Sequence, residues 1–291
     1  MKNLLFLGND GSLVREVLKI KNINLTGIVG DRVTKAEEKC FGSSYVIGKK
    51  VRLPIVTQKD FNNECRRYLK TVFKNTDIIL IHGYRYKIDK RLLGFKKIKI
   101  INFHQSLLPA YAGRHPLNWA IIHGEKSTGI SFHYVNEEFD AGDIIMQKKI
   151  SIAPSDTIIT LYKKTIDAGI KCLKDVFCLM GDESFIPKQQ EKNARSYFSP
   201  RTPEDGRIRA TDSHADICNK IRALTYPYPG AFIDLHGRRY IVEGVERIRA
   251  KSQHNHIGFV GIVDNRIIVR TKDSLLTVRK TRGNSERVIL K

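Results

Sequence analysis

Short apolar runs alternate with helix-length segments through the first third of this chain, and no other feature constrains the fold as strongly. Buried strands are predicted at residues 4–8, 24–30, 77–82 and 99–104, with a further strand beginning at 54–57. Residues 12–20 and 59–74 are predicted as helices, while 31–53 show no clear period and are expected to form a loop region. Strands that alternate with helices in this way form a parallel sheet, so we predict an α/β fold.

A second group of elements completes this part of the chain. A helix is predicted from Pro116, because proline suits the first turn of a helix. Two further strands are predicted at residues 129–135 and 143–152. Apolar residues then recur three and four positions apart from Ile158 to Met180, which indicates a long helix that covers one face of the sheet.

The composition becomes polar after this helix, with prolines at positions 187, 200 and 203. We therefore predict an α/β domain at 1–185, a linker at 186–212 and a second domain at 213–291. The second domain begins with a helix near 213–224 and continues from residue 229 in short alternating runs separated by Gly, Asn and Asp. A small β-barrel of about five strands is the expected structure.

The net charge of the chain limits the classes of binding partner but does not identify one. The chain has 51 Lys and Arg against 30 Asp and Glu, a formal net charge of 51 − 30 = +21. Such a charge attracts nucleic acid, anionic lipid or phosphorylated small molecules. The basic residues form scattered pairs such as Lys49–Lys50 and Arg238–Arg239, with no run of five or six. This distribution favours a solvated surface over a nucleic-acid footprint.

Cysteine usage and hydropathy indicate a reduced, cytoplasmic protein. The cysteines are Cys40, Cys65, Cys172, Cys178 and Cys218, an odd number without any CxxC pair. This pattern argues against a disulfide framework and against a thiolate zinc site. The start MKNLLFLGNDGS is interrupted too soon by Asn and Asp for a signal peptide, and no run reaches the ~18 apolar residues of a membrane span.

Three polar residues form a candidate site. Asn102 and His104 occupy alternate positions at the end of the strand predicted at 99–104, so both side chains lie on one face. Ligands of open parallel sheets bind at this carboxyl edge. Asp140 lies between two predicted strands, where its carboxylate could pair with His104 and hold the orientation of the imidazole. Taken singly, a strand-end His is more often structural and an Asp–Gly turn is usually only a turn, so the interpretation depends on the joint pattern.

These residues belong to a longer ordered motif. Its parts are Asn102-x-His104, Ser106-Leu107-Leu108-Pro109, Tyr111-x-Gly113-Arg114-x-Pro116-Leu117-Asn118-Trp119, Gly124-Glu125, Thr128-Gly129-Ile130 and Asp140-Ala141-Gly142-Asp143-Ile144-Ile145. The motif resembles the formyltransferase family that uses N10-formyltetrahydrofolate. The order of α/β domain, linker and small barrel is also similar to the two-domain branch of that family. The resemblance implies a Rossmann-like parallel-sheet domain followed by an OB-like β-barrel.

The resemblance also implies the chemistry. Asn102, His104 and Asp140 correspond to the catalytic trio of the family, which transfers a formyl group from N10-formyltetrahydrofolate, the donor co-substrate, to a primary amine. His104 would take the proton of the attacking amine. Asn102 would donate to the developing oxyanion, an interaction worth about 3 kcal/mol when preorganised. Asp140 would tune His104 and organise the water through which protons move, and no metal is required.

Binding residues follow from the same resemblance. The pterin and formyl ends of the folate would lie along Tyr86, Lys87, Ile88, Arg114, Asn136, Glu137, Glu138, Phe139 and Asp140. Asn9 and Asp10 come directly after the first predicted strand and are placed to contact a nucleotide or sugar. That motif is weak, because a turn with two glycines after a strand is at least as often only a turn.

The acceptor amine distinguishes three branches of the family, which use aminoacyl-tRNA, a nucleotide-linked amino sugar or glycinamide ribonucleotide. The last branch is usually a single α/β domain, so the predicted barrel counts against it. The net charge favours tRNA, but residues 113–119 and 197–206 resemble the sugar branch, and 31–53 lack the Arg- and Gly-rich insertion of the tRNA branch. We therefore predict formyl transfer to a dTDP- or UDP-linked deoxyamino sugar, for surface polysaccharide or O-antigen biosynthesis, with methionyl-tRNA formyltransferase as the alternative.

A second alternative is a catalytically inactive scaffold whose basic barrel binds RNA. OB-type barrels bind single strands through aromatic side chains and basic grooves, and Tyr226, Tyr228, Phe232 and Tyr240 could serve in this way. The presence of all three catalytic residue types argues against it. The expected partners are therefore folate and a nucleotide-linked amino sugar rather than nucleic acid. A homodimer is consistent with the resemblance, although no stripe of residues identifies its interface.

Overall fold

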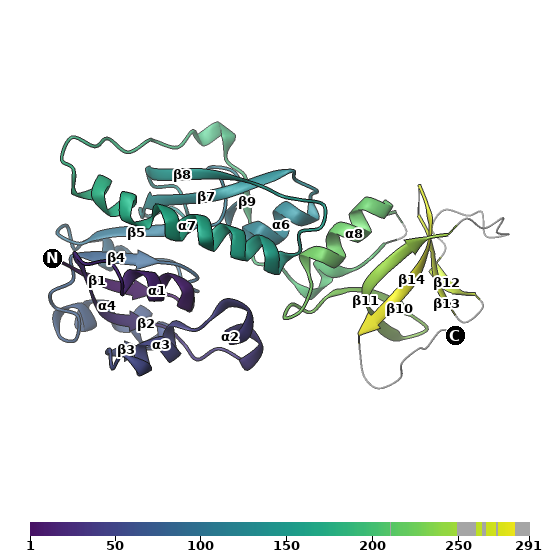
Figure 1. Ribbon diagram of the computed structural model, residues 1–291, viewed down its shortest axis with the longest axis horizontal. Coiled ribbons are helices and arrows are strands. Elements are labelled where there is room, and N and C mark those ends of the chain that lie inside the picture. The colour runs from purple at the N-terminus through teal and green to yellow at the C-terminus, as the bar shows by residue number, and fades with distance from the viewer. Residues whose placement is uncertain (210, 249–259, 264–265, 272, 283–291) are drawn as a thin grey trace. The chain divides into compact units, whose positions relative to one another are not determined.

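The computed structural model describes residues 1–209, 211–248, 260–263, 266–271 and 273–282 (Figure 1). These residues divide into two compact units. The first unit consists of Met1–Pro116, Thr128–Ser151 and Tyr162–Phe198, and the second of Leu117–Ser127, Ile152–Leu161 and the described part of Ser199–Lys291.

The first unit is built on a seven-stranded sheet with the strand order β3-β2-β1-β4-β5-β7-β8 (Figure 1). Its strands are β1 (Lys2–Leu7), β2 (Ile23–Val29), β3 (Ile55–Val56), β4 (Ile78–Ile81), β5 (Lys99–His104), β7 (Ser127–Tyr134) and β8 (Ile144–Ser151). Neighbouring strands from β3 to β5 are parallel, and β7 is antiparallel to β5. The predicted α/β class with a mainly parallel sheet is confirmed.

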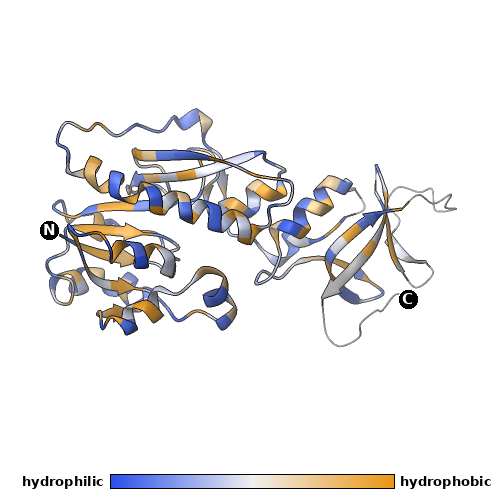
Figure 2. Cartoon of the chain, in the orientation of Figure 1, coloured by the Kyte–Doolittle hydropathy of each residue, from blue (hydrophilic) through white to orange (hydrophobic). Residues whose placement is uncertain are grey.

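Helices cover both faces of this sheet, which explains why its strands are almost continuously apolar. The α-helices between Met1 and Gly181 are α1 (Gly11–Val17), α2 (Lys35–Phe41), α3 (Ser44–Lys50), α4 (Gln58–Lys70), α5 (Lys90–Leu93), α6 (Pro116–Ile122) and α7 (Ile158–Gly181). Leu4 and Phe6 of β1 pack in one core with α1 and α7, whereas Leu5 and Leu7 pack in a second core with α4. Figure 2 shows the central strands coloured as hydrophobic.

Two short helices, α2 and α3, lie within residues 31–53, where a loop region is predicted. α2 begins with a capping box between Thr34 and Glu37 but buries no residue. Ser43 caps the first turn of α3, which buries only three residues. Helices of two turns with little or no buried face leave no apolar period, so the expectation of a loop is wrong for an identifiable reason.

The order of the strands creates a switch point between β1 and β4. The chain proceeds outward from β1 to β2 and β3, then returns to β4 on the other side of β1. In open α/β sheets, ligands bind outside the carboxyl ends of the strands at such a point. Gly8 follows β1 with a φ of +140°, and a Cβ there would overlap the carbonyl oxygen of His82 after β4. Glycine therefore allows the two strand ends to approach each other.

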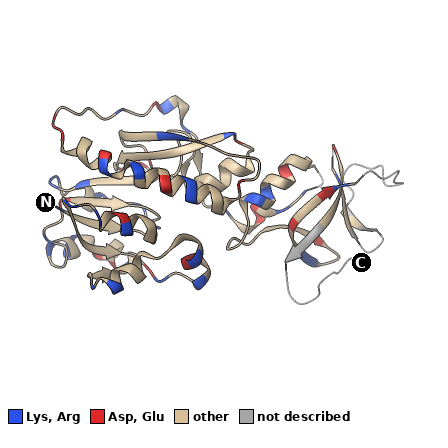
Figure 3. Cartoon of the chain, viewed as in Figure 1, with Lys and Arg blue, Asp and Glu red and all other residues tan. Residues whose placement is uncertain are grey.

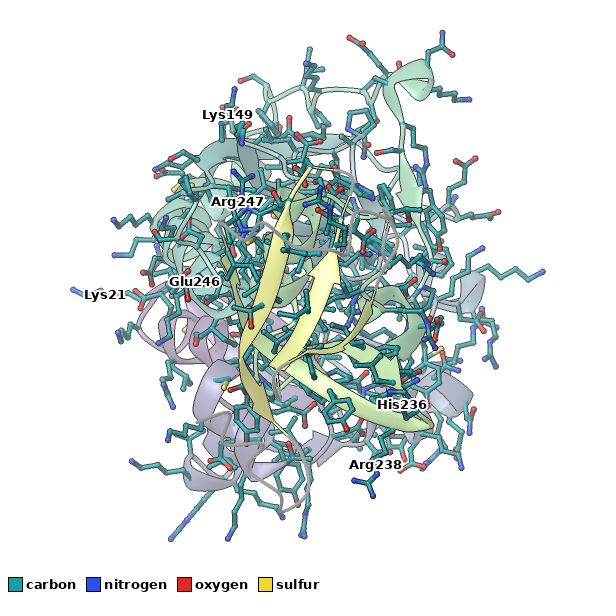
Figure 4. The ribbon with its side chains drawn as sticks, turned by 90° about the vertical axis from the view of Figure 1, so that its right-hand side faces the viewer. Lys21, Lys149, His236, Arg238, Glu246 and Arg247 are labelled. Carbon is teal, nitrogen blue, oxygen red and sulfur yellow. The ribbon has the colours of Figure 1, made fainter. Side chains whose placement is uncertain are left out.

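The second unit contains a five-stranded antiparallel sheet with the order β10-β11-β14-β13-β12. Its strands are β10 (Ala231–Leu235), β11 (Arg238–Arg247), β12 (Val260–Val263), β13 (Arg266–Arg270) and β14 (Leu275–Arg282), and α8 (His214–Ala223) precedes them. Figure 4 shows His236 and Arg238 at one end of the β10–β11 hairpin and Glu246 and Arg247 near the other end of β11. Ile217 of α8 packs in the same core as the sheet.

The five expected strands of the second domain are present. The residues of that expected domain at 249–259, 264–265, 272 and 283–291 lie outside the described residues. β10 and β12 stand at the two edges of the sheet within the described part. The structure thus shows an antiparallel half-barrel.

The segment expected as a linker at 186–212 is partly ordered against the first unit. β9 (Tyr197–Phe198) pairs in parallel with β6 (Ala112–Gly113), and Lys188 exchanges two backbone hydrogen bonds with Ile144, each 2.8 Å. Residues 186–198 of this segment belong to the first unit. The domain limits at 185 and 213 stay a prediction.

Charged side chains show no concentration into a single stripe. Figure 3 shows Lys and Arg spread over helices and strands of both units, interspersed with Asp and Glu. Among the described helices, including the 24-residue α7, none combines the length and apolarity needed to cross a bilayer.

Candidate active site

Asn102 and His104 lie at the carboxyl end of β5, as predicted. The antiparallel register places Asn102 opposite His133 and His104 opposite Ser131 on β7. Opposite residues of paired strands project from the same face of a sheet. The register therefore brings His133, which is not among the residues predicted for the site, beside the predicted trio.

Asp140 joins this group from the turn between β7 and β8. Its φ is +50°, a left-handed conformation that Asp and Asn tolerate better than most residues. One carboxylate oxygen accepts a hydrogen bond from the backbone N–H of Gly113 at 2.8 Å, and the other accepts from Nδ2 of Asn102 at 3.1 Å. The structure thus brings all three predicted catalytic residues together.

Two imidazoles flank the carboxylate of Asp140. Nδ1 of His104 and Nε2 of His133 each lie 3.6 Å from one of its oxygens, and only 11% of the Asp140 side chain is exposed. Burial alone would raise the pKa of Asp140, but His104, His133 and the N–H of Gly113 outweigh it and hold that pKa below its ordinary value. Asp140 is therefore a carboxylate at neutral pH.

The hydrogen bonds also define the histidine tautomers. Nε2 of His104 lies 2.9 Å from the carbonyl oxygen of Tyr111, and Nδ1 of His133 lies 2.7 Å from that of Tyr134. A carbonyl oxygen can only accept, so these nitrogens carry the protons. Nδ1 of His104 is consequently the atom that faces Asp140 and is able to take up a further proton.

His133 fixes the amide of Asn102. In its neutral form His133 accepts at Nε2 from Nδ2 of Asn102, at 3.1 Å, while the second N–H of that amide points to Asp140. The reversed amide would place its oxygen against the carboxylate of Asp140. The side chain of Asn102 is thus held with its nitrogen toward the two acceptors.

The residues predicted to bind folate lie on two neighbouring loops. Tyr86, Lys87 and Ile88 follow β4, and the ammonium group of Lys87 lies 5.6 Å from the ring centre of Phe139. Tyr86 and Phe139 are 38% and 41% exposed, which is high for aromatic residues. Asn136, Glu137 and Glu138 form the exposed start of the second loop. Their contact with a ligand stays a prediction.

Arg114 extends the same region from the chain after β6. Its guanidinium donates to the backbone carbonyl of Arg85, which connects it to the loop that follows β4. The described residues contain no group of three or more His, Cys, Asp and Glu side chains arranged to hold a metal ion.

Asn9 and Asp10 occupy the switch point, and their side chains have structural partners. Oδ1 of Asn9 accepts from the N–H of Asp31 at 2.9 Å and from Nε2 of Gln58 at 2.8 Å. Asp10 caps α1 by accepting from Leu13 at 2.9 Å, and it also accepts from the hydroxyl of Tyr162. These bonds hold the sheet edge together, and substrate contact by Asn9 and Asp10 stays a prediction.

We expect Gly142→Ala to lower the free energy of unfolding by about 1–3 kcal/mol, the range for overpacking a close contact. An added Cβ would overlap the carbonyl oxygen of Tyr134. Urea unfolding measures the change. Gly181→Ala is the control, because a Cβ there meets nothing within 4 Å, and it should be neutral or stabilise by up to about 1 kcal/mol. Equal results for both variants would show that the 140–142 turn yields to the added methyl group.

Comparison with known families gives two matches. Residues 4–177 match the profile described as Formyl transferase, and residues 201–289 match that described as Formyl transferase, C-terminal domain. The first match covers more than half of the chain and includes Asn102, His104 and Asp140.

Solved structures show a similar fold at low identity. HypX from Aquifex aeolicus, solved with tetrahydrofolic acid, is 18% identical with a TM-score of 0.61 over 97% of this chain; the chain spans only 44% of HypX. An N-formyltransferase from Helicobacter canadensis, solved with folinic acid and dTDP-3-aminofucose, is 16% identical with a TM-score of 0.68, over 97% of this chain and 100% of that one. Methionyl-tRNA formyltransferase from Clostridium thermocellum is 21% identical with a TM-score of 0.59, and the match covers 90% of this chain and 99% of that one.

Proposed function

Because this chain belongs to the formyl transferase family, we propose that it transfers a formyl group from N10-formyltetrahydrofolate to the primary amine of a nucleotide-linked deoxyamino sugar. The arrangement of Asn102, His104 and Asp140 at one end of β5 carries the proposal. The nucleotide is dTDP or UDP in this proposal, and the product serves surface polysaccharide or O-antigen biosynthesis. A cytoplasmic location and a homodimer are further expectations.

The donor is supported by the loops beside the trio. The exposed rings of Tyr86 and Phe139, with the ammonium group of Lys87 near the Phe139 ring, suit a flat conjugated ligand that carries carboxylates. HypX and the Helicobacter canadensis enzyme were solved with tetrahydrofolic acid and folinic acid. The folate would supply the formyl group as an amide-like carbonyl.

The chain's own residues would position and move protons. Nδ1 of His104 faces the carboxylate of Asp140, so a proton accepted there from the attacking amine would be stabilised by that negative charge. Asn102 would donate to the formyl oxygen as negative charge develops on it. Both N–H groups of Asn102 have acceptors here, so this donation replaces its contact with His133.

The proposal of a nucleotide-linked amino sugar as the acceptor is supported by two structural neighbours. The Helicobacter canadensis enzyme was solved with dTDP-3-aminofucose, and another structural neighbour, WlaRD, is described as a sugar 3N-formyl transferase. The net charge of +21 and the Clostridium thermocellum structure favour methionyl-tRNA as a second candidate acceptor.

A direct assay decides between these acceptors. We expect release of tetrahydrofolate from N10-formyltetrahydrofolate with one member of a panel of nucleotide-linked 3-amino and 4-amino deoxysugars, and none with charged initiator methionyl-tRNA. The reverse result would assign the tRNA activity. Failure of every acceptor, combined with RNA binding that falls steeply with salt, would indicate the inactive RNA-binding scaffold instead.

A further inference from the structure

Residues 188–198, here called the strap, cross from one loop of the candidate site to the other. At one end, Lys188 pairs with Ile144 just beyond the Asp140 turn. At the other end, the backbone of Ser196 accepts from Ala112 at 2.9 Å, and that of Phe198 accepts from Arg114 at 3.0 Å. The strap therefore joins the 140–144 turn to the 109–114 segment.

Each of these loops supplies a contact to the catalytic trio. Gly113 donates its N–H to Asp140, and Tyr111 accepts from His104. Tyr111, like Asp140, has a left-handed backbone, with a φ of +56°. Such conformations persist only where the surroundings hold them. Ser196 holds Tyr111 by accepting from its N–H at 2.8 Å, and Phe198 stacks on the Tyr111 ring at 4.9 Å.

Gln190 makes the corresponding contacts at the Asp140 turn. Its Nε2 donates to the carbonyl oxygens of Asp140, at 2.9 Å, and Gly142, at 2.7 Å. Both acceptors are carbonyls, so only the nitrogen of the amide can face them. The oxygen of the same amide is buried without a hydrogen-bond partner among the described residues. The side chain is thus anchored through its donor end alone.

We propose that Gln190 is a positioning residue, which fixes the backbone of Asp140 so that its carboxylate meets His104, His133 and the N–H of Gly113. Gln190 is not itself a predicted catalytic or ligand-binding residue, and it acts through Asp140, which is both. This inference rests on the proposed function for its kinetic consequence, but its structural consequence, the placement of a carboxylate, is independent of the substrate.

Gln190→Glu is the sharpest test, because it keeps the shape and replaces the donor with a carboxylate that repels both carbonyls. Gln190→Met removes the hydrogen bonds without adding charge. The matched control is Gln189→Glu, which makes the same chemical change at the exposed neighbouring position. Thermal unfolding of all three variants establishes that they are folded, and if Gln190→Glu is not, Gln190→Met decides.

The first readout is the pKa of the Asp140 carboxyl group. It is measured from the NMR chemical shift of the carboxyl carbon as a function of pH, in protein labelled at aspartate. In the wild type, His104, His133 and Gly113 hold the pKa of Asp140 below its ordinary value against the effect of burial. A displaced carboxylate loses these partners but stays buried, so its titration in the uncharged variant Gln190→Met should move upward by about one pH unit or more. In Gln190→Glu the new negative charge adds to this upward shift. Gln189→Glu should titrate as the wild type does.

The second readout is kinetic. We expect kcat of Gln190→Glu to fall by about 10- to 100-fold with a smaller change in KM, since a misplacement of about 1 Å can cost about 100-fold. A folded Gln190→Glu with unchanged titration and unchanged kcat would overturn the proposal. If the wild type uses none of the acceptors tested, the proposed function fails, and the titration alone decides the role of Gln190.

Discussion

His104→Asn should reduce kcat/KM for formyl transfer by at least ~100-fold, the usual contribution of general acid–base catalysis. The imidazole is placed between the carbonyl oxygen of Tyr111 and the carboxylate of Asp140, with Nδ1 directed at the carboxylate. Asparagine retains polarity and part of the volume but cannot take up a proton. The measurement is steady-state turnover with the acceptor that the panel identifies, together with thermal unfolding.

The control for this substitution is His236→Asn. His236 is exposed at the β10–β11 turn and has a left-handed backbone, with a φ of +48°, which asparagine tolerates (Figure 4). This variant should retain wild-type turnover. Near-normal turnover in His104→Asn would remove His104 from the mechanism and leave proton transfer to water or to Asp140.

The strand that carries Asn102 and His104 could be predicted to the residue. β5 spans Lys99–His104, as the apolar run indicated, because a central strand with helices on both faces of its sheet is buried on both sides and forms a nearly continuous apolar segment. The alternation within that strand then placed both polar side chains on one face. The order of the motif added Asp140, which lies on a turn and has no periodic signal.

His133 could not be found by the same reasoning. Alternation within the predicted strand at 129–135 places Ser131 and His133 on one face, but not opposite any particular residue. Only the antiparallel pairing of β7 with β5 sets His133 against Asn102. The pattern within one strand identifies neither its partner strand nor the register of their pairing.

The strap was missed for a related reason. Its sequence is polar and flanked by prolines, which is typical of a linker. Its contacts with the site are made by backbone groups and by single side chains such as Gln190 and Ser196. Such contacts have no period, so the fold of the sheet was predictable from the sequence while its support of the site was not.

Asp140→Asn should also reduce kcat/KM by about 100-fold or more, because a neutral amide cannot stabilise a proton on His104. Asparagine tolerates the left-handed backbone, so the turn is kept. Either orientation of the new amide, however, places its NH₂ against a donor, the N–H of Gly113 or Nδ2 of Asn102. Asp143→Asn, three residues away and exposed, is the control and should retain wild-type turnover.

The pH dependence of stability separates the charge of Asp140 from its shape. A carboxyl group whose pKa is lowered on folding contributes stability that is fully present above its ordinary pKa of 3.8 and is lost as the pH falls toward the folded pKa. The wild type should therefore exceed Asp140→Asn in free energy of unfolding by the largest margin near pH 6–7. That margin should narrow below about pH 4.

Urea unfolding of the wild type and Asp140→Asn between pH 3 and pH 7 measures this margin. A margin that stays constant down to pH 3 would show that only the lost hydrogen-bond geometry matters. In that case the loss of activity in Asp140→Asn would have to be assigned to a misplaced His104 rather than to the missing charge.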